Sequence, residues 1–535
     1  MRQKPELDFN HLCRRHCLAV VAFQIFALII AAWLFHHALN PDAVAYLQIA
    51  QHYANGDTSL AISGHWSPLI SWLIAIFLKL GLPAITAARW FMVLSAVIFL
   101  LGCLRVFRQF KISTPSLVLG MWLMALLSIP WSVENITPDL LLGGLIGFAF
   151  AEMAVTRWFL QPGAAFFCGI LWGLAYLGKS MALPLGILTT CGMAVLWWKN
   201  QPNQKIKITR ALGLTILGMT LVASVWIAIL TTHYGKLTIA NSAGYNHSLV
   251  GPNVVKHLFL LDQGLRVPQP ERITIWEDPT LPYPDWSPLV SWSNAKLQLQ
   301  IMLHNMPVVL LMLTSVSLVF PVLLGTGMVR VMRRNNSAGE GPTVWWALLP
   351  VALLAGLYLP NYLLVSEQRY FYCAAPLLFV AATGWKYFDA GRWPHRATVL
   401  LIACFLIPTF ARTGLYLNST QIAGQCASIL AEKISEKHLA GSVVGSGKLP
   451  GGRTGLYVAY LLQQPWFGDE PLPAAADYKS IGARLLIVNR RSTPATELAN
   501  DRTVRNLDVE LFGSAENAAH FPLQVFENLS AALTK

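Results

Sequence analysis

Long apolar stretches alternate with short polar connections over the first 412 residues, and this alternation predicts the elements of the chain. Most stretches are near the roughly 17 to 25 residues that a membrane-spanning helix needs. About twelve can be separated, near residues 18–35, 67–82, 86–104, 115–131, 139–156, 163–178, 180–198, 211–230, 306–329, 343–365, 370–386 and 397–412. No small-x-small cleavage site follows the first stretch, so we expect an uncleaved anchor. The pattern predicts an all-α polytopic membrane protein.

Lys and Arg in the short connections orient these stretches, because cytoplasmic loops carry an excess of positive charge. Arg14 and Arg15 place the N-terminus in the cytoplasm. Four clusters should lie on the same side: Arg105 with Arg108 and Lys111; Lys199 with Lys205, Lys207 and Arg210; Arg330 with Arg333 and Arg334; and Lys386 with Arg392 and Arg396. All clusters fit if the short stretch at 67–82 lies in the interface or re-enters. About eleven crossings then remain, with outer loops at about 36–88 and 231–305.

The character of the chain changes beyond about residue 418. A helical pattern at 422–437 is followed by short β-like runs at 442–445, 484–489 and 509–512. This alternation predicts a small α/β domain outside the membrane. We therefore expect a transmembrane domain at 1–413 and an extracytoplasmic α/β domain at 414–535.

Composition and charge agree with a membrane protein and exclude other classes. Hydrophobic residues make up 55% of the 535 residues and charged residues only 12%, which is too apolar for a soluble protein. The net charge of +13 is spread over cytoplasmic loops and the tail, so it indicates positive-inside bias and contact with lipid headgroups, and no nucleic-acid partner. Eight cysteines, mostly in apolar stretches, indicate neither a disulfide framework nor a zinc cluster.

Two acidic residues stand where the apolar stretches meet water on the predicted outer side. Asp42 follows the first apolar stretch, and Asp139 stands at the head of another. An ionisable group at membrane depth or at its edge is costly, so its default interpretation is a functional group facing a polar cavity. With the stretch at 67–82 in the interface, both acids lie on the same face. Together they predict a site there.

Four motifs in chain order resemble those of the GT-C membrane glycosyltransferases, in the branch that includes protein O-mannosyltransferases and the lipid A aminoarabinose transferase. The motifs span most of the membrane part, from Asp42 to about Pro376. They are Asp42-Ala-Val-Ala-Tyr46 with Gly56-Asp57 and Pro68-Leu-Ile-Ser-Trp72; Thr137-Pro-Asp139; a glycine-rich helix from Gly169 ending in Lys179; and Glu367-Gln-Arg369-Tyr370. The resemblance implies the GT-C fold. It also implies sugar transfer from a polyprenyl-phosphate donor to a lipid, glycan or protein acceptor, with inversion at the anomeric carbon.

This chemistry assigns expected roles to the matching residues. A carboxylate must orient and deprotonate the acceptor hydroxyl, and cations must neutralise the departing phosphate. The resemblance makes Asp42 the catalytic base, with Asp139 holding a cation or the acceptor. Lys179 and Arg369 suit the phosphate, one as a point charge and the other as a planar fork of donors. The remaining predicted substrate-binding residues are Tyr46, His65 and Tyr370.

The chain departs from the family pattern at two places. His65-Trp-Ser-Pro68-Leu69 stands where many relatives have Lys-Pro-Pro-Leu, so a contact of that lysine with the donor phosphate is either missing or replaced by His65. Ala43 follows Asp42 where the first motif is often Asp-Glu, which leaves one carboxylate where some relatives have two. The sequence identifies no metal ligands, and it does not require a divalent metal cofactor.

Each candidate also has a structural interpretation. Asp42 and Asp139 both follow a proline and suit the first turn of a helix, as a cap or through the helix dipole. Lys179 could extend its ammonium to the membrane interface, and Arg369 could pair with Glu367. His65 could be an ordinary polar residue at the interface.

Two other functions remain open at this stage. A transporter or flippase of lipid-linked sugars would also place charges at membrane depth, although inverted repeats and broken helices are expected there. A ligase or polymerase of surface polysaccharide would use the same kind of donor. We expect a multi-pass protein of the bacterial inner membrane, in contact with membrane lipids, with its active site and C-terminal domain outside the cytoplasm.

Overall fold

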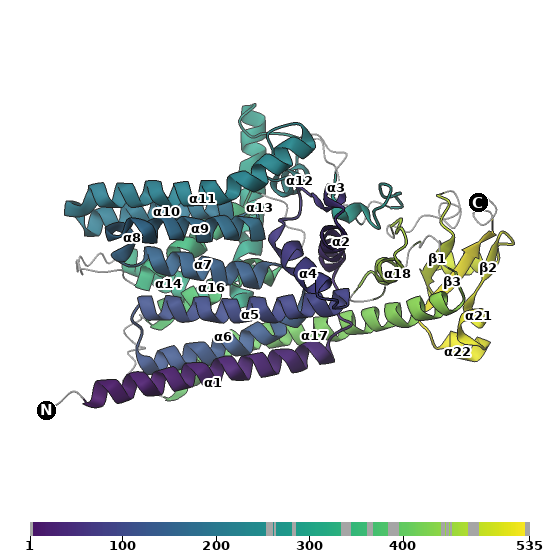
Figure 1. The fold of residues 1–535 in the computed structure, drawn as a ribbon, viewed down its shortest axis with the longest axis horizontal. Coiled ribbons are helices and arrows are strands. Elements are labelled where there is room, and N and C mark those ends of the chain that lie inside the picture. The colour runs from purple at the N-terminus through teal and green to yellow at the C-terminus, as the bar shows by residue number, and fades with distance from the viewer. Residues whose placement is uncertain are drawn as a thin grey trace.

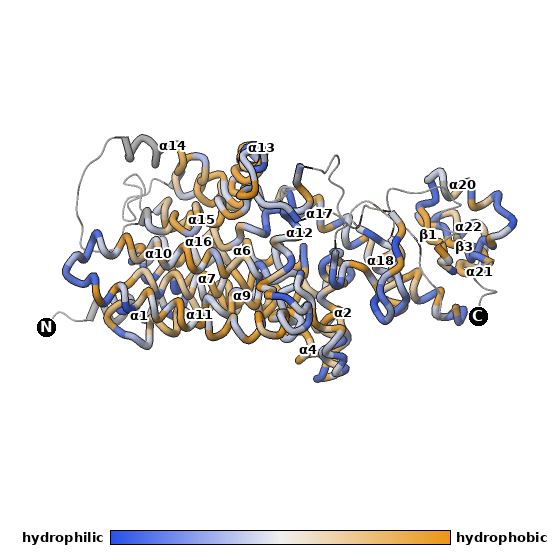
Figure 2. The backbone as a smooth tube through the Cα atoms, turned by 90° about the horizontal axis from the view of Figure 1, so that it is seen from above, coloured by the Kyte–Doolittle hydropathy of each residue, from blue (hydrophilic) through white to orange (hydrophobic). Residues whose placement is uncertain are grey.

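The computed structural model describes residues 4–252, 261, 264–280, 285–332, 344–360, 367–383, 395–439, 445, 449, 452–468 and 481–529. Long helices form a bundle, and a small sheet lies beyond one end of it (Figure 1). The bundle helices are largely apolar along their length, whereas polar segments gather at the connections (Figure 2). The predicted all-α membrane protein with a small C-terminal α/β part is confirmed.

The first half of the chain supplies most of the bundle. Its helices run side by side (Figure 1): α1 (Lys4–Leu34), α5 (Ala84–Gln109), α6 (Thr114–Glu134), α7 (Asp139–Met153), α9 (Pro162–Gly178), α10 (Ala182–Asn200) and α11 (Lys205–Tyr234). Glycine lets these helices pack closely, as small residues do between membrane helices. A Cβ at Gly169 in α9 would lie 2.1 Å from the carbonyl oxygen of Thr215 in α11. One at Gly102 in α5 would lie 2.6 Å from the carbonyl oxygen of Gly144 in α7.

Seven helices among the described residues are long and apolar enough to cross a membrane. They are Arg14–Leu34, Ala84–Gln109, Thr114–Glu134, Ala182–Asn200, Pro202–Tyr234, Trp292–Val316 and Arg396–Glu436. Shorter apolar helices are Leu69–Lys79, Pro162–Gly178, Leu348–Tyr358 and Ala374–Thr383. The first of these, α4, falls in the stretch expected to stay in the interface, and its 11 residues reach only about 16 Å. The total of about eleven crossings stays a prediction.

The apolar stretch expected at 306–329 is divided between two helices. α13 (Trp292–Val316) lies across the bundle, and α14 (Val319–Met332) follows it (Figures 1 and 2). Ser317 separates them with an extended backbone, and the N–H of Leu318 donates to the carbonyl oxygen of Cys404, 2.9 Å away. A backbone hydrogen bond to α17 thus replaces helix continuation at this point.

Short helices cover the end of the bundle that faces the sheet. In Figure 1, α2, α3, α4, α12 and α18 lie between the long helices and the C-terminal strands. Their bounds, with those of the remaining helices outside the C-terminal part, are α2 (Pro41–Asn55), α3 (Thr58–Ala61), α4 (Leu69–Lys79), α8 (Arg157–Leu160), η1 (Pro202–Gln204), α12 (Ser242–Ser248), η3 (Ile275–Glu277), η4 (Val344–Ala347), α15 (Leu348–Tyr358), η5 (Gln368–Phe371), α16 (Ala374–Thr383) and α18 (Thr454–Leu462).

The C-terminal part is joined to the bundle by one long helix, α17 (His395–Glu436), which contains the expected domain boundary at 413. The sheet has the antiparallel order β1-β3-β2, from β1 (Leu485–Asn489), β2 (Val504–Asn506) and β3 (Leu523–Asn528). Its accompanying helices are α20 (Thr493–Ala499), α21 (Asp508–Phe512) and α22 (Ala515–Ala519).

Of the β-like runs expected in this part, the one at 484–489 forms a strand, β1. The run at 509–512 lies in α21, so that strand prediction was wrong. The Asn506 side chain accepts from the N–H of Asp508 at 2.8 Å, and Gly513 ends the helix with φ 79°, so local turn chemistry outweighs β propensity. The run at 442–445 lies almost entirely outside the described residues.

A buried arginine fastens the helix ends beneath the short helices. Arg89 of α5 is only 4% exposed and donates to three backbone carbonyl oxygens, those of Val133 at 3.2 Å, Phe35 at 2.9 Å and Ala38. These carbonyls belong to the ends of α6 and α1. One guanidinium therefore fixes the two helix ends that lead to Asp42 and Asp139.

Replacing this guanidinium should destabilise the fold. Arg89→Met leaves buried carbonyl oxygens without donors, which costs about 1 to 3 kcal/mol for each unsatisfied group. We expect a clearly lower midpoint of thermal unfolding in detergent. The matched control is Arg108→Met on the exposed surface of the same helix, which should change stability by less than about 0.5 kcal/mol. Equal midpoints for the two variants would contradict the role of Arg89.

Candidate active site

Asp42 lies in the first turn of α2, but its carboxylate does not cap that helix. The N-cap position is Asn40, with Pro41 at the first helical position. One carboxylate oxygen of Asp42 lies 2.8 Å from Nη1 of Arg369, and the other accepts from Nε1 of Trp276 at 3.2 Å. Proline and the extended Asn40 therefore start the helix, and they leave the acid free to face its partners.

Arg369 comes from the short helix η5, 327 residues further along the chain. Its Nε also pairs with Glu367, 3.1 Å away, so the pairing considered from the sequence exists alongside the pairing with Asp42. The Arg369 side chain is 13% exposed and that of Asp42 is 17% exposed. This shielding from water strengthens the attraction between the two charges.

Asp139 and Lys179 form a second ion pair. Asp139 opens α7, and its side chain is 3% exposed. Lys179 follows the end of α9 with an extended backbone, and its Nζ lies 2.6 Å from the carboxylate of Asp139. The Lys179 side chain is 24% exposed, so its ammonium is the more accessible partner. The Lys179 side chain therefore points to Asp139 and does not extend to the membrane interface.

Tyr370 joins the two ion pairs. Lys179 Nζ lies 4.2 Å from the centre of its ring, and Arg369 Cζ lies 5.5 Å from it. Both distances allow cation–π attraction. The ring also stacks on Tyr358, with centroids 5.0 Å apart and planes at 9°. Five of the predicted residues, from four distant parts of the chain, therefore make one contiguous charged cluster.

Tyr46 and His65 lie in an aromatic group beside this cluster. Tyr46 is 5% exposed and packs edge-on against Trp66 at 4.8 Å. The His65 ring contacts Trp66, Tyr245 and Trp276, with centroids 4.6, 4.9 and 5.1 Å apart. Burial lowers the pKa of His65 to about 4, against the opposing attraction of Asp42. His65 is therefore neutral at pH 7 and supplies no positive charge to the site.

Sequence patterns did not identify two residues near this site. Trp276 donates to Asp42 from within the outer loop at 231–305, where nothing distinguishes it from other tryptophans. Arg272 lies four residues before Trp276, and its side chain is only 5% exposed. Its guanidinium is 4.0 Å from the carboxylate of Asp278, and a buried charge with so distant a counter-ion is costly. Only the folded structure shows this burial.

The cluster contains the shielded carboxylate of Asp42, which could act as a base. It also contains two cations that could neutralise a phosphate. The described residues contain no group of three or more His, Cys, Asp or Glu side chains placed to hold a metal ion. The cations of the cluster are Lys179 and Arg369. This set can accept a proton and stabilise a departing anion.

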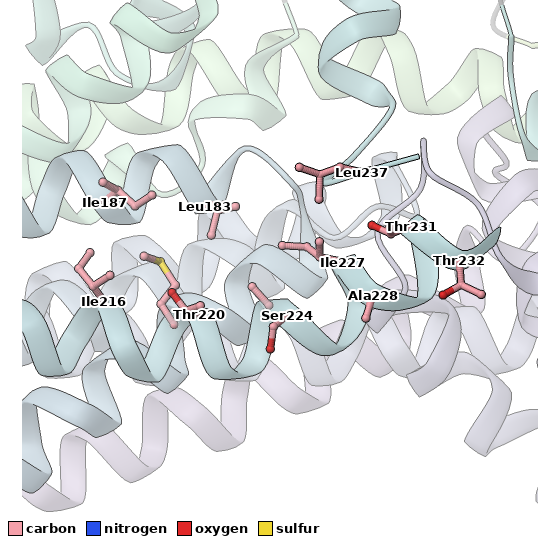
Figure 3. A pocket seen from close by; sticks show the side chains of 12 residues that line it. Leu183, Ile187, Ile216, Thr220, Ser224, Ile227, Ala228, Thr231, Thr232 and Leu237 are labelled. Carbon is pink, nitrogen blue, oxygen red and sulfur yellow. The ribbon is translucent and has the colours of Figure 1, made fainter. Parts of the chain in front are cut away.

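An apolar groove lies between α10 and α11, close to Lys179. Its volume is about 480 Å³. Leu183 and Ile187 line it from α10, small side chains such as Thr220, Ala223 and Ser224 line it from α11, and Leu237 lies at one end (Figure 3). Leu183 lies in the first turn of α10, four residues after Lys179 in the chain.

The bundle, with a charged cluster under short helices at one end, has the GT-C fold, as comparison with solved structures shows. The chain is similar to the solved structure of ArnT from Cupriavidus metallidurans bound to undecaprenyl phosphate, with a TM-score of 0.58 and 14% identity over 96% of this chain and 97% of that one. It is also similar to ArnT in the apo state, with a TM-score of 0.57 and 13% identity over 97% and 99% of the two chains.

A further solved structure, arabinofuranosyltransferase AftD from Mycobacteria, aligns with 96% of this chain and 40% of its own, at 14% identity and a TM-score of 0.45. No protein-family model and no curated protein sequence matches the chain. At such low identity, the similarity to ArnT establishes the fold, and it confirms the fold that the sequence motifs implied.

The environment of His65 should make stability depend on pH. Between pH 6.5 and about 4, the unfolded chain binds a proton at this residue that the folded chain does not. Its contribution is therefore present at neutral pH and is lost as the pH falls. From pH 7.5 to 5.0, the wild type should lose about 1 to 2 kcal/mol more stability than His65→Phe. Thermal unfolding of both proteins measures this, and identical pH dependence would contradict it.

Proposed function

We propose that the chain transfers a sugar from a polyprenyl-phosphate donor to an acceptor at the outer face of the bacterial cytoplasmic membrane, with inversion at the anomeric carbon. The observation that carries this proposal is the shielded contact between Asp42 and Arg369 beside the Asp139–Lys179 pair. The fold supports the class of enzyme. The ArnT structure with undecaprenyl phosphate supports the class of donor.

The residues suggest a direct displacement. Asp42 accepts the proton of the acceptor hydroxyl while that oxygen attacks the anomeric carbon. The bond between the sugar and the phosphate oxygen breaks, and the polyprenyl phosphate leaves with the bonding electrons. Its phosphate gains one negative charge, which Arg369 and Lys179 stabilise. Attack from the face opposite the leaving group inverts the anomeric carbon.

The ion pairs of the donor-free protein have a role in this scheme. Asp42 and Asp139 keep the two cations in place while the phosphate is absent. A donor phosphate then competes for Arg369 and releases one oxygen of Asp42 to act as base. Asp139, with its side chain only 3% exposed, keeps Lys179 oriented throughout.

The positive charge at the opposite end of the bundle supports an outward-facing site. Arg105 and Arg108 lie in the last turns of α5, and Lys199 and Lys205 border the connection between α10 and α11. In Figure 1, these connections lie at the end of the bundle away from the short helices and the sheet. By the positive-inside rule, this charge distribution favours a cluster and a C-terminal part outside the cytoplasm.

The groove between α10 and α11 fits the hydrocarbon chain of the donor. From Ile216 to Thr232, groove residues recur along α11 over about 24 Å, most of the roughly 30 Å hydrocarbon core. A chain lying there would bring its phosphate end to Lys179. We expect the groove to hold the polyprenyl chain.

Removing the proposed base should abolish transfer without unfolding the protein. Asp42→Asn preserves the shape of the side chain and deletes its charge, so turnover of a radiolabelled polyprenyl-phosphate sugar should fall by at least about 100-fold. Asp285→Asn is the matched control, because Asp285 is an exposed acid of the outer loop at 231–305 and lies outside the motifs. Equal turnover in both variants would remove Asp42 from the mechanism. Labelled lipid that crosses the bilayer without sugar transfer would favour a transporter.

Filling the groove should discriminate between donors by chain length. Ser224→Trp places a large ring in the groove from an exposed position on α11, so we expect turnover of a long-chain donor to fall at least about fivefold while a donor of two or three isoprene units is unaffected. Val225→Trp on the exposed surface of α11, at 62% exposure, is the control. Parallel losses with both donors would place the chain elsewhere.

A further inference from the structure

A segment of the C-terminal part contacts the loop that leads to Asp42. Tyr457 of α18 is fully buried, and its hydroxyl donates to the carbonyl oxygen of Leu39 at 3.0 Å. Leu39 lies three residues before Asp42. Asn40 follows it, and the Asn40 side chain accepts from the N–H of Ile136 at 2.9 Å. The start of α2 is therefore fixed from two sides, by α18 and by the connection before α7.

The same segment contacts the loop that carries Trp276. The N–H of Trp466 donates to the carbonyl oxygen of Ile273 at 2.7 Å, and Arg453 Nη1 donates to that of Leu261 at 3.0 Å. Ile273 leads into η3, a 3₁₀ turn closed by a capping box between Thr274 and Glu277. The N–H groups of Ile273 and Thr274 both donate to Glu277 Oε1, at 2.8 and 3.0 Å, so a contact at Ile273 also helps to hold the turn that carries Trp276.

The two contacts meet at Asp42. Leu39 sets the backbone from which the carboxylate projects, and Trp276 holds one of its oxygens. A third contact, from Gln48 Nε2 of α2 to Oε1 of Gln463 at 3.3 Å, ties the later turns of α2 to the end of α18. In Figure 1, α18 lies between α2 and the sheet, where it can hold both loops at once.

We propose that the segment 453–467 positions the carboxylate of Asp42, with Tyr457 as a positioning residue for the reaction. The inference rests on the proposed function for its catalytic consequence, but the contacts themselves can be tested without it. The C-terminal part then has a role within the membrane site, because it sets the direction of the base. Misplacement of a catalytic group by about 1 Å can lower turnover by about 100-fold.

The test compares two conservative substitutions on the same helix. Tyr457→Phe removes only the hydroxyl that holds Leu39. Tyr460→Phe is the matched control, because Tyr460 is also buried and its hydroxyl has no hydrogen-bond partner among the described residues. We expect Tyr457→Phe to lower kcat about 5- to 20-fold with the donor KM unchanged within about twofold. Tyr460→Phe should leave both constants at the wild-type values.

Hydrogen–deuterium exchange of the full-length proteins supplies a readout that does not depend on activity. Peptides covering 36–50 and 264–280 should exchange faster in Tyr457→Phe than in the wild type, and at the wild-type rate in Tyr460→Phe. Unchanged exchange in these peptides, or an unchanged kcat in an active enzyme, would overturn the proposal. If the wild type transfers no sugar, the proposed function fails, and the exchange result alone decides whether Tyr457 fixes the loop.

Discussion

The contact between Asp42 and Arg369 is the constraint on which the site depends. Each charge is largely removed from water at one end of an apolar bundle, where an unpaired charge would be strongly destabilising. Arg369 can reach Asp42 only if the bundle brings η5 beside the start of α2. The second pair, Asp139 with Lys179, imposes the same requirement on α7 and α9, and Tyr370 joins the two. The long helices, the short helices that cover them and the C-terminal segment together hold the residues of these two pairs in place.

The support is built from backbone contacts more than from further charges. Arg89 donates hydrogen bonds to backbone carbonyl oxygens at the ends of α1 and α6. Tyr457, from outside the bundle, donates to the carbonyl oxygen of Leu39. Such contacts fix the main chain, so they orient the side chains that project from it.

Much of this arrangement could be predicted from the sequence. Apolar spacing predicted the membrane bundle, and the Lys and Arg clusters placed Asp42 and Asp139 at the same end, where they lie. The motifs identified the cluster of Asp42, Asp139, Lys179, Arg369 and Tyr370, although their catalytic roles stay predictions.

Long-range packing decided what the sequence could not show. Trp276 was missed because its partner lies 234 residues away, and the neutrality of His65 depends on rings from three separate segments. The strand expected at 509–512 was wrong because local turn chemistry formed α21 there. α17 likewise continues across residue 413 because it packs between the bundle and the sheet. A local sequence pattern cannot show this packing.

The most direct test of the account is the side of the membrane on which donor is consumed. Purified protein can be reconstituted in vesicles of known orientation, and radiolabelled polyprenyl-phosphate sugars can be supplied from one side with an acceptor mixture. The account predicts that sugar is released from the donor only where the face bearing Asp42 and the C-terminal part is exposed. Consumption at the opposite face, or movement of intact labelled donor across the bilayer without consumption, would contradict it.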